Sequence, residues 1–226
     1  MGVGLIGNTK TLLGKELRTE FRSRELLTTT SVFILIVLVL FSFTITPGTE
    51  EARAFAPGLL WLAILFAASL MFQSCFLREQ VNDTLSSLRL AVSDPFSIFL
   101  AKLGANTMFL LLTELVMLPV FAMFYNIPLL PKLPELLLTL LVGSLGIAIA
   151  GTAISAISAQ ARMRELLLPL LLLPLLTPVL VVSSLVTASL LDRDPVVQWK
   201  GIAFVGVYDV IFLTALWIFG EYLLEE

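Results

Sequence analysis

The chain has 226 residues, of which 58% are hydrophobic and 14% are charged, and its formal net charge is −3. Soluble domains contain roughly 45–50% apolar and about 25% charged residues, so this composition excludes an ordinary water-soluble protein. A single cysteine excludes an internal disulfide, and the lack of histidine removes the commonest metal ligand, haem ligand and general base.

The N-terminal segment, residues 1–25, is predicted to hold a cytoplasmic or interfacial amphipathic helix. Leu13, Leu17 and Phe21 recur every four residues, which aligns them on one helix face. Basic residues lie largely away from this face: Lys10, Lys15, Arg18, Arg22 and Arg24. Helices of this kind tend to lie in the membrane interface. Two roles stay open: an elbow that braces the membrane helices or contacts a partner, and a topology anchor.

Residues 26–224 are predicted to form a transmembrane domain of six helices. A helix rises about 1.5 Å per residue, so about 20 apolar residues cross roughly 30 Å of hydrocarbon. Clusters of proline and charged residues separate the apolar segments. The predicted spans are 26–46, 56–76, 99–125, 135–159, 166–191 and 201–224.

The distribution of basic residues predicts the orientation of these helices. Ten of the 14 Lys and Arg residues lie on the side that also carries the two chain ends. Because Lys and Arg concentrate in cytoplasmic loops, both termini are predicted in the cytoplasm. The simplest setting is a multi-pass protein of the bacterial inner membrane.

The longest predicted cytoplasmic connection, residues 77–97, mixes charged with regularly spaced apolar residues. Leu85 and Leu88 belong to the apolar set, which predicts short amphipathic helices, and Asp94 followed by Pro95 is typical of a helix start. A short exposed helix between two spans can dock in a cavity on the surface of a partner protein. The alternative is a loop that lies on its own bundle.

Two carboxyl side chains, Glu114 and Asp209, are predicted inside the membrane, in the third and sixth spans. Ionisable groups in hydrocarbon are costly and usually face a bundle interior, a partner or water. They are candidates for a polar lining, a gate or a helix contact, or they are neutral or hydrogen-bonded structural groups. The sequence does not fix the distance between them.

The fourth span is predicted to be a packing helix. Ser144, Ala148, Thr152 and Ala156 recur every four residues, and small residues let helix backbones approach closely.

The fifth span is predicted to be bent or broken, because it contains Pro169, Pro174 and Pro178. Each proline removes a backbone donor from the helix. A moving element and a fixed kink are both open.

No catalytic motif stands out in the sequence. In particular, it has no G-x-x-x-x-G-K-[ST] motif, the P-loop that binds the phosphates of ATP. If the protein works with an ATPase, that activity is expected on a separate chain. Six spans, an interfacial N-terminal helix and a helical loop after the second span together favour an all-α membrane protein of the ABC-2-like permease type. The chain itself is expected to be non-catalytic.

Four stretches give the chain a more specific resemblance. They are KELRTEFRSRE (15–25), FAPGLLWLAILFA (55–67), SDPFSIFLAK (93–102) and ARMRELLLPLLLLPLLTPVLV (161–181). With these stretches the chain resembles the CcmB family, the membrane subunit of the cytochrome c maturation system, sometimes called haem exporter protein B.

The resemblance implies a set of partners and a role. A CcmA-like ATPase would pair with this chain, as two copies of each, beside CcmC- and CcmD-like membrane subunits and a CcmE-like haem chaperone. ATP hydrolysis would be linked to the release of the haem-loaded chaperone. This chain would bind no cofactor, since the ATPase binds ATP and other subunits handle haem, and it would have no nucleic-acid partner. The loop 77–97 would be the coupling helix that docks in the ATPase, through Arg78, Glu79, Asp83, Leu85, Leu88, Arg89 and Asp94.

Two alternatives remain. The first is another ABC-2-type exporter subunit, which would move a lipid, a polysaccharide or a drug. The second is an intramembrane enzyme that uses Glu114 or Asp209.

Overall fold

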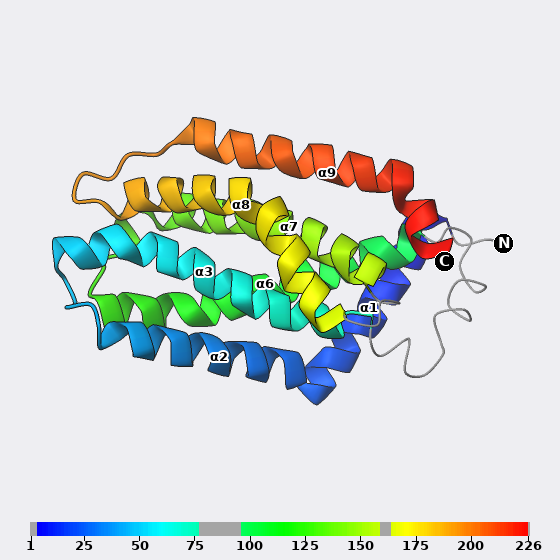
Figure 1. The fold of residues 1–226 in the computed structure, drawn as a ribbon, viewed down its shortest axis with the longest axis horizontal. Helices are drawn as coiled ribbons and strands as arrows, with labels where there is room; N and C mark the ends of the chain where they lie inside the picture. The colour runs from blue at the N-terminus through cyan, green and yellow to red at the C-terminus, as the bar shows by residue number, and fades with distance from the viewer. Residues whose placement is uncertain (1–3, 77–95, 159–163, 226) are drawn as a thin grey trace.

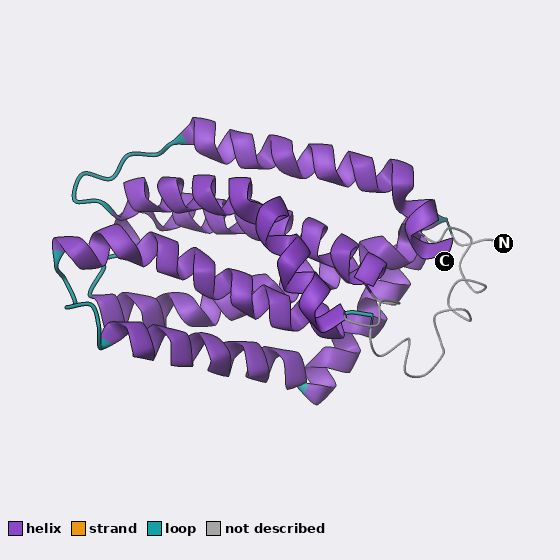
Figure 2. Cartoon of the chain, viewed as in Figure 1, coloured by secondary structure: helices purple, strands orange, loops and turns teal. Residues whose placement is uncertain are grey.

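The computed structural model describes residues 4–76, 96–158 and 164–225, and in these ranges every regular element is a helix (Figures 1 and 2). The prediction of an all-α membrane protein is therefore confirmed. Six of the helices are long and apolar enough to cross a membrane. The elements are α1 (Leu5–Ser23), α2 (Glu25–Ser42), α3 (Glu50–Ser74), α6 (Phe96–Tyr125), η1 (Leu130–Lys132), α7 (Leu133–Ser158), α8 (Arg164–Leu191) and α9 (Trp199–Glu225).

The first two spans differ from their predicted ends. The helix α2 ends at Ser42 rather than at residue 46. The chain tightens into a turn there, since the Thr44 amide donates to the Phe41 carbonyl three residues back. The helix α3 begins at Glu50, ahead of the predicted start at 56. Thr49 caps α3, since its hydroxyl accepts from the Ala52 amide at 3.2 Å. The apolar pattern alone missed this charged first turn.

The helix α7 lies at the centre of the bundle. It packs against α3, α6, α8 and α9, whereas α2 packs against α3 and α6 at one edge and α9 lies at the other (Figure 1). Large apolar side chains point outward from these edge helices, among them Ile36 of α2 and Val210 of α9. Such an apolar exterior is suited to lipid.

Three glycines make the central position of α7 possible. A Cβ added at Gly151 would collide with the ring of Phe72, and one at Gly143 would collide with the indole of Trp61, both on α3. At Gly146 it would lie 2.5 Å from an Asp209 carboxyl oxygen of α9. The prediction that this span is a packing helix is confirmed.

Replacing Gly151 is expected to destabilise the bundle. In Gly151→Ala the new methyl group meets the buried Phe72 ring, and overpacking of this kind costs about 1–3 kcal/mol. The control is Gly206→Ala, because its Cβ would meet no atom closer than 4.0 Å. Thermal unfolding in detergent measures the difference. Equal midpoints for the two variants would contradict the packing described for α7.

Candidate functional site

Lys102 is a buried cation in the second turn of α6. This end of α6 lies at the end of the bundle where α1 lies and α9 ends (Figure 1). It is only 3% exposed, and its Nζ donates to the Cys75 carbonyl oxygen of the chain just past α3 at 2.6 Å. The same Nζ lies 3.5 Å from Glu16 Oε1 of α1 and 4.9 Å from the centre of the Phe76 ring. A buried charge needs partners of this kind. Lys102 thus joins α1, α6 and the end of α3.

Asn106, one turn further along α6, extends this connection to α7. Its Nδ2 donates to Thr152 Oγ1 at 2.9 Å and lies 3.2 Å from the sulfur of Cys75. The hydroxyl of Ser155 in α7 donates to the Phe72 carbonyl of α3 at 2.7 Å. The last turn of α3 is therefore held from two sides.

The helix α1 joins α2 through a tight elbow. Arg24, between the two helices, has a left-handed backbone with φ of 56°. Glu20 is buried, and its Oε1 accepts from the Leu26 amide at 2.7 Å and the Leu27 amide at 3.3 Å. A carboxylate at a helix start satisfies free amides and suits the helix dipole. The elbow angle is fixed by these contacts.

The apolar face of α1 packs along α6. Leu13 lies over Gly104, and the rings of Phe21 and Phe109 meet edge to face at 6.1 Å. The predicted basic residues all point outward and are exposed: Lys10, Lys15, Arg18, Arg22 and Arg24. Of the two roles left open for this segment, these contacts favour the elbow that braces the membrane helices.

Sequence reasoning missed the roles of Lys102 and Asn106, because Lys102 counted only as a topology charge. The signal in the sequence was two polar residues one helical turn apart inside an apolar span.

Removing the Lys102 ammonium is expected to loosen this junction. Lys102→Met takes a hydrogen-bond donor from the Cys75 carbonyl and a cation from Glu16, at a cost of about 1–3 kcal/mol. The control is Lys132→Met, because the Lys132–Glu135 pair has the same 3.5 Å separation but is partly exposed, and such pairs contribute about 0–1 kcal/mol. Thermal unfolding of both variants in detergent provides the comparison. A larger loss in the control would refute this account of the junction.

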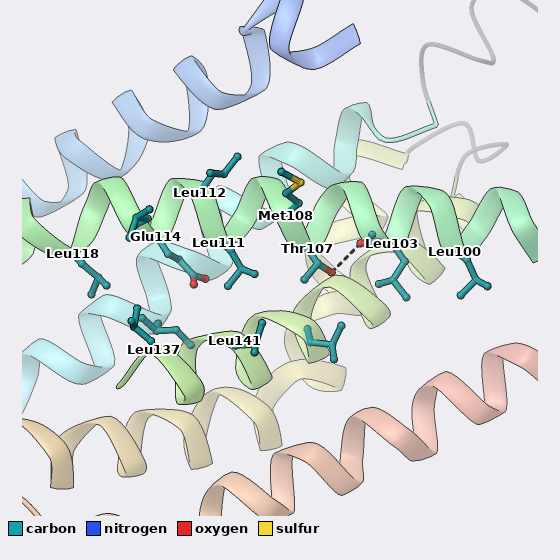
Figure 3. A pocket seen from close by; sticks show the side chains of 14 residues that line it. Leu100, Leu103, Thr107, Met108, Leu111, Leu112, Glu114, Leu118, Leu137 and Leu141 are labelled. Atoms are coloured by element: carbon teal, nitrogen blue, oxygen red, sulfur yellow. Dashed lines mark hydrogen bonds between the residues drawn. The ribbon is translucent and has the colours of Figure 1, made fainter. Parts of the chain in front are cut away.

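A groove of about 640 Å³ runs along the outside of α6 and α7 (Figure 3). Its walls are mainly leucines, from Leu100 to Leu118 on α6 and from Leu137 to Leu145 on α7. Thr107 and Glu114 supply its polar side chains, and the Thr107 hydroxyl is already bonded to the Leu103 carbonyl at 2.8 Å. The groove is therefore apolar apart from one carboxyl group.

Glu114 lies on the floor of this groove, where its side chain points from α6 towards α7 (Figure 3). It is 2% exposed, and Ser144 of α7 donates a hydrogen bond to its Oε1. Its Oε2 is buried and has no hydrogen-bond partner among the described residues. One oxygen is thus satisfied within the bundle and the other is not.

Asp209 of α9 is buried against a different face of α7. It lies opposite Gly146, and neither of its carboxyl oxygens has a partner in the part of the chain that the structure describes. Ser144 and Gly146 are two residues apart, which places them about 200° apart around α7. Glu114 and Asp209 therefore contact α7 from opposite sides and do not share one site.

The three prolines of the fifth span, Pro169, Pro174 and Pro178, lie inside α8, which continues as one helix through all of them, so the alternative of a broken helix is wrong. Figure 1 shows α8 changing direction along its length. The Tyr208 hydroxyl of α9 donates to the Leu175 carbonyl at 2.7 Å, and the Trp61 indole of α3 donates to Thr187 Oγ1 at 2.9 Å. These contacts hold α8 on two neighbours. Its movement stays a prediction.

The predicted docking residues lie outside the described part of the chain, in the segment 77–95. This applies to Arg78, Glu79, Asp83, Leu85, Leu88, Arg89 and Asp94. The segment connects the end of α3 to the start of α6, the two ends that Lys102 joins. Docking itself stays a prediction. Among the described residues, no group of three His, Cys, Asp or Glu side chains gathers as a metal site.

Comparison with known proteins gives a family match over most of the chain. The family described as CcmB protein matches residues 8–215. A protein of Pseudomonas aeruginosa named heme exporter protein B is 32% identical over 159 residues, which are 70% of this chain and 71% of that protein. Proteins of the same name from Haemophilus influenzae and Escherichia coli K12 are 29% identical over 159 residues and 31% identical over 93 residues. They cover 70% and 41% of this chain, and 72% and 42% of their own lengths.

Proposed function

Because the chain belongs to the CcmB family, as its sequence predicted, we propose that it is the membrane subunit of an ABC-type complex for cytochrome c maturation. It couples ATP hydrolysis by a separate CcmA-like subunit to haem handling and to the release of the haem-loaded chaperone. The observation that carries this proposal is the family match from residue 8 to residue 215, which includes all or part of all six spans.

The partners follow from the same family. Two copies of this chain pair with two ATPase subunits, beside CcmC- and CcmD-like membrane subunits and a CcmE-like chaperone, in the bacterial inner membrane. The bundle end with α1 and both termini faces the cytoplasm, which the exposed basic residues of α1 support. This chain has no histidine, so the commonest axial ligand of haem would have to come from the other subunits.

The junction around Lys102 supports the coupling role. A loop docked in the ATPase moves the ends of α3 and α6, between which it lies. Lys102 binds these ends to each other and to α1, and Asn106 binds them to α7. Packed helices respond to such a displacement as rigid bodies. Movement at the loop thereby reaches the centre of the bundle.

The apolar groove favours one alternative, an ABC-2-type exporter subunit for a lipid or a drug. A hydrophobic groove of about 640 Å³ has the size of a small-molecule site. Such an exporter shares the docking loop but not the effect on c-type cytochromes. Glu114 and Asp209 lie on opposite sides of α7, so an intramembrane enzyme would have to use one of the two carboxyl groups without the other.

Deletion of this chain is expected to abolish c-type cytochromes and to leave haem trapped on the chaperone. Haem staining of membrane proteins and of the isolated chaperone, with and without a complementing plasmid, provides the readout. Normal c-type cytochromes in the deletion strain would contradict the proposed function. The alternative of an ABC-2-type exporter subunit would then remain.

Reversing the charge at Arg78 and Arg89 is expected to weaken docking of the ATPase. In the proposed complex the two arginines face acidic groups of the ATPase, and like charges across an interface are repulsive. Arg78→Glu with Arg89→Glu should therefore reduce co-purification of the ATPase with this chain. The control is Arg193→Glu, because Arg193 pairs with Glu50 at the opposite end of the bundle (Figure 1). Undiminished co-purification of the double variant would exclude this loop as the docking element.

A further inference from the structure

The groove on α6 and α7 has the length of a membrane span. Leu100 and Leu118 lie 18 residues apart on α6, which corresponds to about 27 Å of helix, close to the roughly 30 Å of bilayer hydrocarbon. Its rim carries exposed apolar side chains, Met108 at 40% and Leu115 at 60%. A groove of this shape accommodates one face of another transmembrane helix.

The unpaired oxygen of Glu114 gives the groove a chemical preference. Hydrocarbon offers no hydrogen-bond donor, so a buried carboxyl oxygen without a partner is costly there. Ser144 satisfies Oε1 and leaves Oε2 without a donor in the described parts of the chain. Polar side chains inside membranes typically bond across a helix–helix interface.

We propose that this groove is the docking site for a transmembrane helix of another protein, which presents a long donor side chain to Glu114. Because Glu114 is only 2% exposed beneath the leucines, the donor has to reach inward, as Lys, Arg or Gln can. The rest of the docking face is apolar and fills the space between the leucines of α6 and α7.

Other occupants fit the groove less well. A lipid chain fills its apolar volume but donates no hydrogen bond to Oε2. A second copy that packs groove to groove brings more leucines, and its own Glu114 is only 2% exposed beneath them, so that side chain does not reach inward to Oε2. An acidic amphiphile brings a further negative group towards a buried carboxyl. A donor-bearing helix satisfies both the shape and the polarity.

Photo-crosslinking in the native membrane tests the proposal. A benzophenone amino acid replaces Leu115 on the groove rim, and the control position is Val210 of α9, which is similarly exposed at 64% but lies outside the groove. The expected product is an adduct, at position 115 only, with a transmembrane segment that contains Lys, Arg or Gln, identified by mass spectrometry.

Variants of Glu114 decide whether the carboxyl recognises this helix. Glu114→Leu removes a buried, incompletely paired polar group, so the chain is expected to remain folded, as size-exclusion chromatography checks. The adduct is expected to fall by about tenfold, the effect of one lost interhelical hydrogen bond. Glu114→Gln retains an acceptor oxygen and is expected to retain most of the adduct.

Three outcomes would overturn the proposal: adducts with lipid only, adducts with a second copy of this chain, and a protein adduct that Glu114→Leu leaves unchanged. None of them depends on the cytochrome phenotype. The proposed docking site and the proposed function can therefore be refuted independently of each other.

Discussion

The close approach of α3 and α9 to α7 determines how the rest of the bundle is arranged. Gly143 and Gly151 leave room for Trp61 and Phe72 of α3, and Gly146 leaves room for the Asp209 carboxyl of α9. Between membrane helices there is little hydrophobic driving force, so van der Waals contact and hydrogen bonds hold them together. Because these glycines have no side chain, both van der Waals contact and hydrogen bonds can form at short range. The helix α7 contacts four other helices.

Polar contacts are concentrated where that central packing meets the membrane surface. Lys102, Asn106 and Glu20 are buried near one end of the bundle. Lys102 and Asn106 both bond to Cys75, Asn106 also bonds to α7, and Glu20 accepts from the start of α2. Breaking one such contact leaves a buried charge or donor unpaired, which is expensive in a low-dielectric setting. The helix ends next to the predicted coupling loop are therefore tied to the bundle by buried polar contacts.

Hydropathy was sufficient to predict the six spans, because the bilayer imposes length and apolarity on each helix separately. The start of α3 at Glu50 was missed, since a threonine cap and two acidic residues form its first turn outside the apolar run. Glu114 and Asp209 were recognised as intramembrane groups, but their separation around α7 depends on which helices pair, and the sequence pattern does not contain that information. The groove was not predicted for the same reason: its leucines come from two helices.

The hydroxyl of Tyr208 links the bend of α8 to the orientation of α9. It reaches the Leu175 carbonyl between Pro174 and Pro178, in the stretch where the prolines have already removed backbone donors from α8. The curvature of α8 therefore depends on its own prolines and on how α9 is turned about its axis. A rotation of α9 about its axis would withdraw that donor, so the bend of α8 and the orientation of α9 depend on the same hydrogen bond.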